Sequence, residues 1–411
     1  SEGYKRQTLS YWLSRVGVDK TAIGLFALVG LPYSLKFAWA PLVDQLSLPV
    51  LTRRLGRRRS WILVTQAGLA AAILAMGAAD PAARPLATAA AALAVAFFSA
   101  SQDIVIDAYR IEVLAEHEQG AGAGATQLGY RIGLLVAGAG ALALSDFIDW
   151  FWIFAMLAGL VVLSMAAVLA APRPPEPALT AEDAARRAPD LPAALAAWLK
   201  GAVVAPFADF MRRPQWPLIL AFALLYKFGD AIGGTMATPF YVEIGFTGVE
   251  VAGVTKVMGV AATMAGTLVG GAVVARYGLF LALLAGGVLQ AATNLLYAAQ
   301  AVMGHDLGFL ALTIGADNFT GGLGSAAFVA YLSSLCTTGF SGTQYALLTS
   351  FMALGRTVLS SGSGWLADHM DWISFFALTT LLALPGLLLL ILLMRRRPGA
   401  VARSEPAPLA R

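Results

Sequence analysis

Residues 92–110 read ALAVAFFSASQDIVIDAYR and place two carboxylates and an amide inside a stretch that is otherwise apolar. Asp103 and Asp107 are four residues apart, so both project from one face of a helix, and Gln102 adjoins the first of them. A carboxylate buried in hydrocarbon costs at least ~2.5 kcal/mol. This cost needs an explanation, which the rest of the sequence supplies.

The composition identifies the solvent around this stretch. Hydrophobic residues make up 58% of the chain, charged residues 13%, and the mean hydropathy is +0.72, whereas about 25% of the residues of a soluble domain are charged. The sequence therefore predicts a polytopic protein in a lipid bilayer. The net charge of +4 does not indicate nucleic acid, because the arginines cluster in short loops beside apolar segments.

The sequence lacks the residues that a metal site, a redox pair or a cofactor site would need. Cys336 is the one cysteine of the sequence, which excludes an intrachain disulfide and a cysteine-based metal site. The three histidines fall in expected loops at no metal-ligand spacing. We expect no cofactor and no metal.

Eleven apolar segments are long enough to cross a hydrocarbon core of about 30 Å. We place these segments at residues 22–43, 60–79, 86–110, 122–145, 150–171, 216–241, 250–275, 279–302, 307–335, 343–367 and 372–394.

The segments form two halves joined by a linker rich in proline and charge. We expect an N-terminal transmembrane bundle at 1–171, a cytoplasmic linker at 172–214 with a short surface helix, a C-terminal bundle at 215–397 and a disordered cytoplasmic tail at 398–411. Basic residues gather in the loop before the second segment, in the linker and after the last segment. The positive-inside rule assigns these three positions to the cytoplasm, with both termini of the complete protein there too.

The two halves repeat. The motif Leu128-Gly129-Tyr130-Arg131 followed by Asp149-Trp150 recurs as Leu354-Gly355-Arg356 followed by Asp371-Trp372, and Gln102-Asp103 is echoed by Asp317-Asn318. A parallel repeat of six-span halves is the architecture of the major facilitator transporters. We therefore expect this fold, all α-helical, with two six-helix bundles. The repeat also indicates that the opening helix of the first bundle is truncated or missing in this chain.

Five stretches together resemble one family. They are LKFAWAPLVD (35–44), GRRRSWIL (56–63), SASQDIVIDAYR (99–110), QGAGAGATQLGYRIGLLVAG (119–138) and LYKFGDAIGGTMATPFY (225–241), and they are similar to the AmpG muropeptide permeases of the Gram-negative inner membrane. The resemblance implies proton-driven import of anhydro-muropeptides, GlcNAc-anhydroMurNAc units with a peptide stem, into the cytoplasm for cell-wall recycling. The acetyl-CoA transporters, or another organic-anion transporter of the superfamily, are the neighbouring alternative. We expect a monomer.

A muropeptide carries carboxylates, hydroxyls and amides, so its site needs cations, amides and aromatic rings within the membrane. We expect such residues to converge on a central cavity between the halves. The candidates for substrate binding are Lys36, Gln102, Tyr130, Arg131, Lys227, Asp230, Asp317, Asn318, Tyr331, Gln344, Tyr345 and Arg356. A purely structural pairing of Lys227 with Asp230, three residues later, stays open.

Proton coupling and gating complete the hypothesis. Asp103 or Asp107 is expected to take the coupled proton, while the alternative that both acids only hold the bundle together stays open. The superfamily resemblance implies a cytoplasmic latch in which Asp44 pairs with Arg110. The gating candidates are Asp44, Arg57, Arg58, Arg59 and Arg110.

Enzyme functions find little support. The sequence has no nucleophile elbow, metal cluster or nucleotide fingerprint. The alternative from a different class is a membrane-embedded acyltransferase, which would demand an intramembrane histidine. We therefore expect a transporter without enzymatic activity.

Overall fold

The computed structural model describes residues 31–79, 83–115, 118–144, 147–174, 190–360 and 362–396. Every regular element within these ranges is a helix. Contacts divide the chain into two compact units: unit 1 holds Ser1–Arg213 with Val329–Leu354, and unit 2 holds Pro214–Phe328 with Gly355–Arg411. The expectation of a truncated opening helix and that of a C-terminal tail fall outside the described residues.

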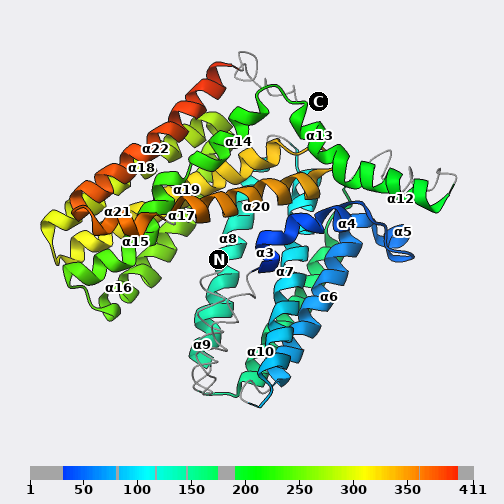
Figure 1. Cartoon of the computed structure of the whole chain (residues 1–411). Helices are drawn as coiled ribbons and strands as arrows, with labels where there is room; N and C mark the ends of the chain where they lie inside the picture. Colours follow the sequence, from blue (N-terminus) through cyan, green and yellow to red (C-terminus); the bar gives the residue numbers. More distant parts are fainter. Residues whose placement is uncertain are drawn as a thin grey trace, which may run out of the picture. The chain divides into compact units, whose positions relative to one another are not determined.

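In unit 1, the long helices α6, α7 and α10 run side by side (Figure 1). The buried side chains of Ile104 and Val105 on α7 pack against Ala40, Val43 and Ile62. The helices of this unit are α3 (Leu31–Leu35), η2 (Lys36–Ala38), α4 (Ala40–Gln45), α5 (Leu51–Leu55), α6 (Arg57–Ala78), α7 (Pro85–Val113), α8 (Gln119–Leu135), η4 (Val136–Gly140), α9 (Ala141–Leu144), α10 (Trp150–Ala170), α12 (Leu191–Leu199), η5 (Lys200–Val204) and α13 (Ala205–Met211).

In unit 2, α18 and α22 lie along each other, and α15 packs on both (Figure 1). Aromatic rings such as Phe240, Tyr297 and Phe376 fill the core between these helices. The helices of this unit are α14 (Trp216–Leu225), α15 (Phe228–Ile244), α16 (Gly248–Val254), η6 (Thr255–Gly259), α17 (Val260–Tyr277), α18 (Leu279–Met303), α21 (Ser363–Asp368) and α22 (Trp372–Arg395). Two further helices, α19 (Leu307–Ser334) and α20 (Ser341–Ser360), run from one unit into the other.

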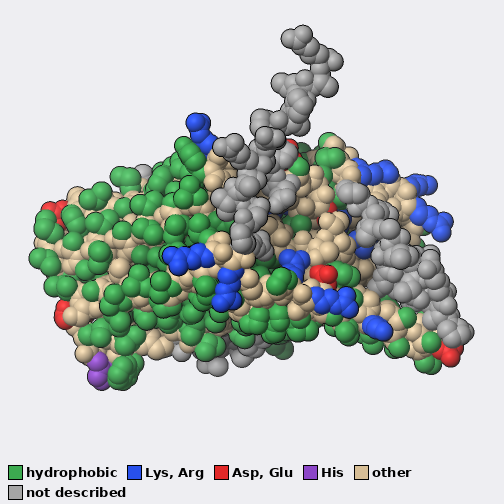
Figure 2. Space-filling model, turned by 90° about the horizontal axis from the view of Figure 1, so that it is seen from above, with side chains coloured by type: hydrophobic (Ala, Val, Ile, Leu, Met, Phe, Trp, Pro, Cys, Tyr) green, Lys and Arg blue, Asp and Glu red, His purple; other side chains and the backbone are tan. Residues whose placement is uncertain are grey.

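The surface is apolar where a membrane helix would meet lipid. Hydrophobic side chains cover most of the helical surface on the face seen in Figure 2. Leu163 on α10 is 69% exposed and Leu388 on α22 is 65% exposed. A soluble protein rarely presents whole helices of exposed leucine and valine, whereas a bilayer favours them.

Eight helices in the described part are long and apolar enough to cross a membrane. Seven of them coincide with segments expected from the sequence. The eighth covers Pro192–Met211, where we expected a surface helix in a linker; its length and hydropathy also suit a membrane span. The boundaries of the four predicted segments stay predictions.

One apolar segment is interrupted where the sequence suggests continuity. α14 ends at Leu225 and α15 begins at Phe228, so Tyr226 and Lys227 form a turn inside a stretch that is long enough to span a membrane. The first turn of α15 contains Asp230, an acid at the positive end of the helix dipole. Transporters place polar sites at such discontinuous helices.

Candidate functional site

The two acids of α7 lie among cations. Asp107 interacts electrostatically with Arg110, Lys36 and Asp103. Lys36, on the short helix η2, is only 8% exposed. Lys36 therefore lies close enough to act on the charge of Asp107.

The serines of the same stretch fasten α7 to the start of unit 1. Ser101 Oγ accepts a hydrogen bond of 3.0 Å from Trp39 Nε1. Ser99 is hydrogen-bonded to the hydroxyl of Tyr33. These bonds fix the helix face that carries Gln102 and Asp103, both of which stay partly exposed.

The pairing of Asp44 with Arg110 expected from the sequence is wrong. Asp44 Oδ1 lies 2.6 Å from Nη2 of Arg58, while Nη2 of Arg110 lies 3.6 Å from Oδ1 of Asp107, three residues before it on α7. The guanidinium of Arg110 also faces the ring of Tyr345, 5.6 Å from its centroid. Arg58 stands in the first turn of α6, which follows the short helix α5 and Gly56.

An ion-pair cluster formed by Asp44, Arg58 and Glu112 holds the N-terminus of α20. Glu112 Oε2 accepts a hydrogen bond of 2.9 Å from Nε of Arg58, and Nη2 of Arg58 donates a second hydrogen bond to Glu112 Oε1. Ser341 Oγ donates to Glu112 Oε1 at 2.5 Å, and Thr343 donates to Asp44 Oδ2 through its amide at 2.9 Å and its hydroxyl at 2.8 Å.

This cluster is almost completely sealed from solvent. The side chains of Arg58, Asp44 and Glu112 are 2%, 0% and 1% exposed. The positive end of the α20 dipole adds favourable charge beside Asp44. Each acid therefore has both a cation and neutral hydrogen-bond donors, which is the condition for a buried ion pair to be tolerated.

The remaining gating candidates are also buried. Arg59 donates to the carbonyl of Leu169 on α10, and Arg57 is 5% exposed. Next to Asp44, Gln45 Nε2 donates to the carbonyl of Gly339 at 2.6 Å. Contacts of α6 with α10, and of α4 with the turn before α20, thus accompany the central ion pairs.

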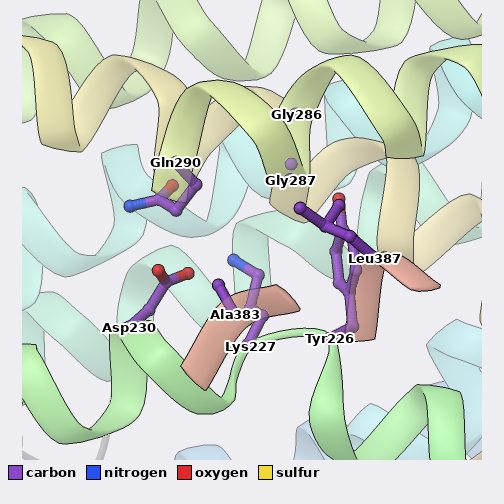
Figure 3. A pocket seen from close by; sticks show the side chains of 9 residues that line it. Tyr226, Lys227, Asp230, Gly286, Gly287, Gln290, Ala383 and Leu387 are labelled. Carbon is purple, nitrogen blue, oxygen red and sulfur yellow. The ribbon is translucent and has the colours of Figure 1, made fainter. Parts of the chain in front are cut away.

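Unit 2 contains a polar pocket, which we define by Lys227, Asp230, Gln290 and Asp317. Lys227, Asp230 and Gln290 line a cavity of about 10 Å³ with Tyr226 and small or apolar residues of α18, α19 and α22. This is about the space that one water molecule needs. Figure 3 shows the side chains of Lys227 and Asp230 reaching toward Gln290 on α18.

Asp317 on α19 is the acid of the polar pocket that accepts hydrogen bonds from neighbouring side chains. Its Oδ1 accepts from Gln290 Nε2 at 2.8 Å and from Thr293 Oγ1 at 3.3 Å, and its Oδ2 accepts from the hydroxyl of Tyr297 at 3.2 Å. Lys227 Nζ donates instead to Ser325 Oγ at 2.7 Å. Lys227 also acts electrostatically on Asp230.

Asn318 follows Asp317 but turns to a different helix. Its Oδ1 accepts from Thr263 Oγ1 on α17 at 3.0 Å, and its Nδ2 donates to the carbonyl of Ile314. The adjacent residues Asp317 and Asn318 thereby bond to different helices, α18 and α17, since successive side chains on a helix point about 100° apart.

The other predicted binding residues have different surroundings. Gln344 is 1% exposed, and protein groups use its amide: Nε2 donates to Pro206 O and Asp209, and Oε1 accepts from Thr337 N. Tyr331 and Tyr345 are buried, Tyr130 is 39% exposed, and Arg356 is exposed. Their predicted convergence on a central cavity stays a prediction.

Two residues of these clusters were missed by the sequence analysis. Glu112 lies one turn or less beyond Arg110, and Gln290 stands alone between apolar residues of α18. A glutamate near a helix end and one glutamine carry weak signals by themselves. Their partners Arg58 and Asp317 are distant in sequence, which is why only the fold reveals them.

Comparisons with known proteins identify the family. The model described as Major Facilitator Superfamily matches residues 8–316. The anhydromuropeptide permease of Escherichia coli (strain K12) is 39% identical over 386 residues, covering 93% of this chain and 75% of the relative. A putative transporter AmpG 4 of Rickettsia conorii (strain ATCC VR-613 / Malish 7) is 33% identical over 388 residues, covering 94% of this chain and 91% of the relative.

Solved structures agree on the fold. The proton:xylose symporter XylE bound to 6-bromo-6-deoxy-D-glucose gives a TM-score of 0.65 at 13% identity, covering 97% of this chain and 93% of the other. The human organic anion transporter MFSD10 gives 0.64 at 18% identity, covering 94% of this chain and 89% of the other. The predicted all-α major facilitator fold is confirmed. With its family match, its relatives and its apolar helices, this chain is a multi-pass member of the major facilitator superfamily and belongs, within it, to the AmpG family of permeases.

Proposed function

We propose that this protein imports anhydro-muropeptides from the periplasm to the cytoplasm across the inner membrane, for the recycling of cell-wall fragments. The observation that carries the proposal is the 39% identity, over 93% of the chain, to a protein named anhydromuropeptide permease. The positive-inside pattern supports a cytoplasmic location of the basic loop at 53–59 and of both termini of the complete protein.

The polar residues of the helices suit such a substrate. Stem-peptide carboxylates need cations, and the described residues offer Lys36, Arg131, Lys227 and Arg356. A guanidinium holds a carboxylate through two parallel hydrogen bonds, so Arg131 and Arg356 are the proposed carboxylate anchors. Tyrosines and amides among the predicted residues would contact the sugar and peptide groups.

We propose that a proton gradient alone drives the import, in a monomer without a bound cofactor. An acid that shares a cation with the substrate can exchange places with the substrate carboxylate when it takes a proton. Protonation on the periplasmic side would release the cation for the substrate, and deprotonation on the cytoplasmic side would restore the internal pair. The membrane-embedded carboxylates of α7 and of the polar pocket are the candidates for this exchange.

The ion-pair cluster is proposed to act as the gate. Its buried bonds tie the N-terminus of α20 to α4, α6 and α7. Alternating access requires elements with two discrete arrangements. Opening toward the cytoplasm would break the bonds of Ser341 and Thr343 and leave the internal pair of Arg58 with Glu112 intact.

The test is uptake of labelled GlcNAc-anhydroMurNAc tripeptide into proteoliposomes that contain the full chain. We expect accumulation above the external concentration when the outside is acidic, and its collapse when a protonophore is added. Acetyl-CoA and a simple organic anion serve as competing substrates. Preferred uptake of either one would overturn the muropeptide assignment, while accumulation that ignores the protonophore would overturn proton coupling.

A further inference from the structure

The polar pocket of unit 2 contains more carboxylates than cations. The charged groups that act on Asp230 are Lys227 and Asp317, so two carboxylates share one ammonium. In a low-dielectric site, an acid without its own counter-charge is costly unless it binds a proton. A pocket with this composition is electrically neutral only when one of its two acids is protonated.

The acids of α7 do not have this excess. Asp107 interacts with Arg110, Lys36 and Asp103, so two cations balance two carboxylates. Asp107 therefore faces two cations and one acid, whereas Asp230 faces one cation and one acid. This difference favours the acid of the polar pocket as the site of the transported proton.

The ion-pair cluster also has two acids and one arginine, but its acids are compensated differently. Asp44 accepts two hydrogen bonds from Thr343 at the positive end of α20, and Glu112 accepts from Ser341. These donors and the helix dipole stabilise the ionised forms.

The two acids of the polar pocket differ in their hydrogen bonding. Asp317 accepts from Gln290, Thr293 and Tyr297, and such donors favour its carboxylate form. Asp230 accepts no hydrogen bond from the described side chains or amides and borders the cavity of about 10 Å³. A water in that cavity would connect Asp230 with Lys227 and Gln290, since all three line it.

We propose that Asp230 is the binding site of the coupled proton, with Asp317 as its hydrogen-bonded partner acid and Lys227 as the cation that they share. Protonation changes the pocket from one negative charge to neutral, with no other bond formed or broken. The proposal deepens proton coupling and rests on the proposed function.

Among the described residues, the other titratable groups that face the pocket are phenols. The neutral phenol of Tyr226, in the turn after α14, faces Asp230. The phenols of Tyr297 on α18 and Tyr241 on α15 face Asp317. α22 contributes Ala383 and Leu387 to the lining. Asp230, Asp317 and Lys227 are thus the groups whose charges decide the protonation.

The experiment compares Asp230→Asn with Asp103→Asn in the full chain in proteoliposomes. Counterflow at equal pH measures substrate exchange, and an acidic exterior measures proton-driven accumulation of labelled GlcNAc-anhydroMurNAc tripeptide. We expect Asp230→Asn to keep counterflow and lose accumulation, and Asp103→Asn to keep accumulation. The control is Asp149→Asn, which should match the wild type. Asp149 is exposed, precedes α10 and makes no capping bond with its side chain.

A second measurement needs no transport. Infrared difference spectra of the substrate-free protein between two pH values should show the C=O band of a protonated carboxyl group, and this band should disappear in Asp230→Asn and persist in Asp103→Asn. Accumulation by Asp230→Asn, or a band that only Asp103→Asn removes, overturns the assignment. If the wild type neither exchanges nor accumulates the muropeptide, the proposed function fails instead, and the infrared band still decides the proton site. Asp317→Asn, which should shift the band to a different pH, replaces Asp230→Asn if that variant does not fold.

Discussion

At the scale of single residues, Arg58 carries a charge that is almost completely buried in unit 1. It is 2% exposed and bonded to Asp44 and Glu112. A buried charge is tolerated when its partners are in place and becomes a liability when one of them is removed. The bonds of Asp44 to Thr343 extend this dependence to the start of α20.

Asp44→Ala should destabilise the folded protein. The substitution leaves Arg58 with one acid and deprives two donors of Thr343 of their acceptor, so we expect a loss of ~3–5 kcal/mol. Thermal unfolding of the detergent-purified protein would show a lower midpoint. Asp368→Ala removes an exposed acid and should leave the midpoint unchanged; equal midpoints for both variants would show that the ion-pair cluster carries no stability.

The sequence predicted the members of this cluster better than their bonds. An acid before a basic loop marks Asp44 and the arginines as a group, but three arginines in a row offer no basis for choosing among them. Arg58 is the arginine that pairs with Asp44, because α6 starts at Arg57 and the first turn of this helix brings residue 58 toward α4 and α7. In unit 2, the sequence marked Lys227, Asp230 and Asp317, and missed Gln290 because its role depends on the packing of α18 against α19.

At the scale of elements, the repeated Asp-Trp motif marks helix starts as expected. Asp149 precedes α10 and Asp371 precedes α22. Only the second makes a side-chain cap: Ser374 N–H donates to Asp371 Oδ2 at 3.1 Å. Sequence identity between repeats therefore predicts the boundary but does not predict the capping bond.

The cap of α22 should depend on pH. The hydrogen bond from Ser374 holds the pKa of Asp371 below its ordinary value of 3.8. Because the folded pKa is depressed, the stabilisation is present above this ordinary value and is lost as the pH falls through the lowered pKa. Amide exchange at Ser374 should accelerate at acid pH relative to Asp371→Asn, in which the side chain keeps an acceptor but cannot titrate. The matched substitution Asp149→Asn should change nothing at Trp152, and a response there would show that the pH effect is not specific to the cap.

Glycines let α17 approach α19 closely. A Cβ at Gly266 would overlap the carbonyl oxygen of Phe319, and one at Gly270 would lie 2.6 Å from that of Leu323. Small residues at helix contacts allow this approach in membrane proteins. The sequence shows the glycines, but the contact between backbones appears only in the fold.

Gly266→Ala should destabilise unit 2 by ~1–3 kcal/mol, since α17 must move away from α19. Gly234→Ala on α15 has no atom within 4 Å of the added carbon and should stabilise its helix by up to about 1 kcal/mol, because alanine favours helices. The opposite signs make the pair informative in thermal unfolding. Two destabilising results would point to a general sensitivity of the helices and would contradict the packing argument.

At the scale of the whole molecule, apolar segment length predicted most of the helices within a few residues. The prediction works because a bilayer demands long apolar helices whose backbone bonds are satisfied internally. It failed to show the turn at Tyr226 and Lys227, since apolar residues continue on both sides of that turn. This break positions Lys227 and Asp230, so the feature that segment length missed is the one that shapes the polar pocket.

The last prediction concerns the substrate carboxylates and the two arginines that the repeat relates. If Arg131 and Arg356 each make charge-assisted hydrogen bonds to a stem carboxylate, replacement of either by alanine should weaken binding by ~1.5 to 3 kcal/mol. Arg276→Ala supplies the control, because this arginine is exposed at the end of α17 and faces the ring of Tyr277. Binding is measured by calorimetry with GlcNAc-anhydroMurNAc tripeptide and with the same sugar lacking its peptide. The arginine variants should lose affinity for the tripeptide and bind the bare disaccharide as the wild type does. An equal loss for both ligands would mean that the arginines contact the sugar or support the fold, and normal tripeptide binding would remove them from the site.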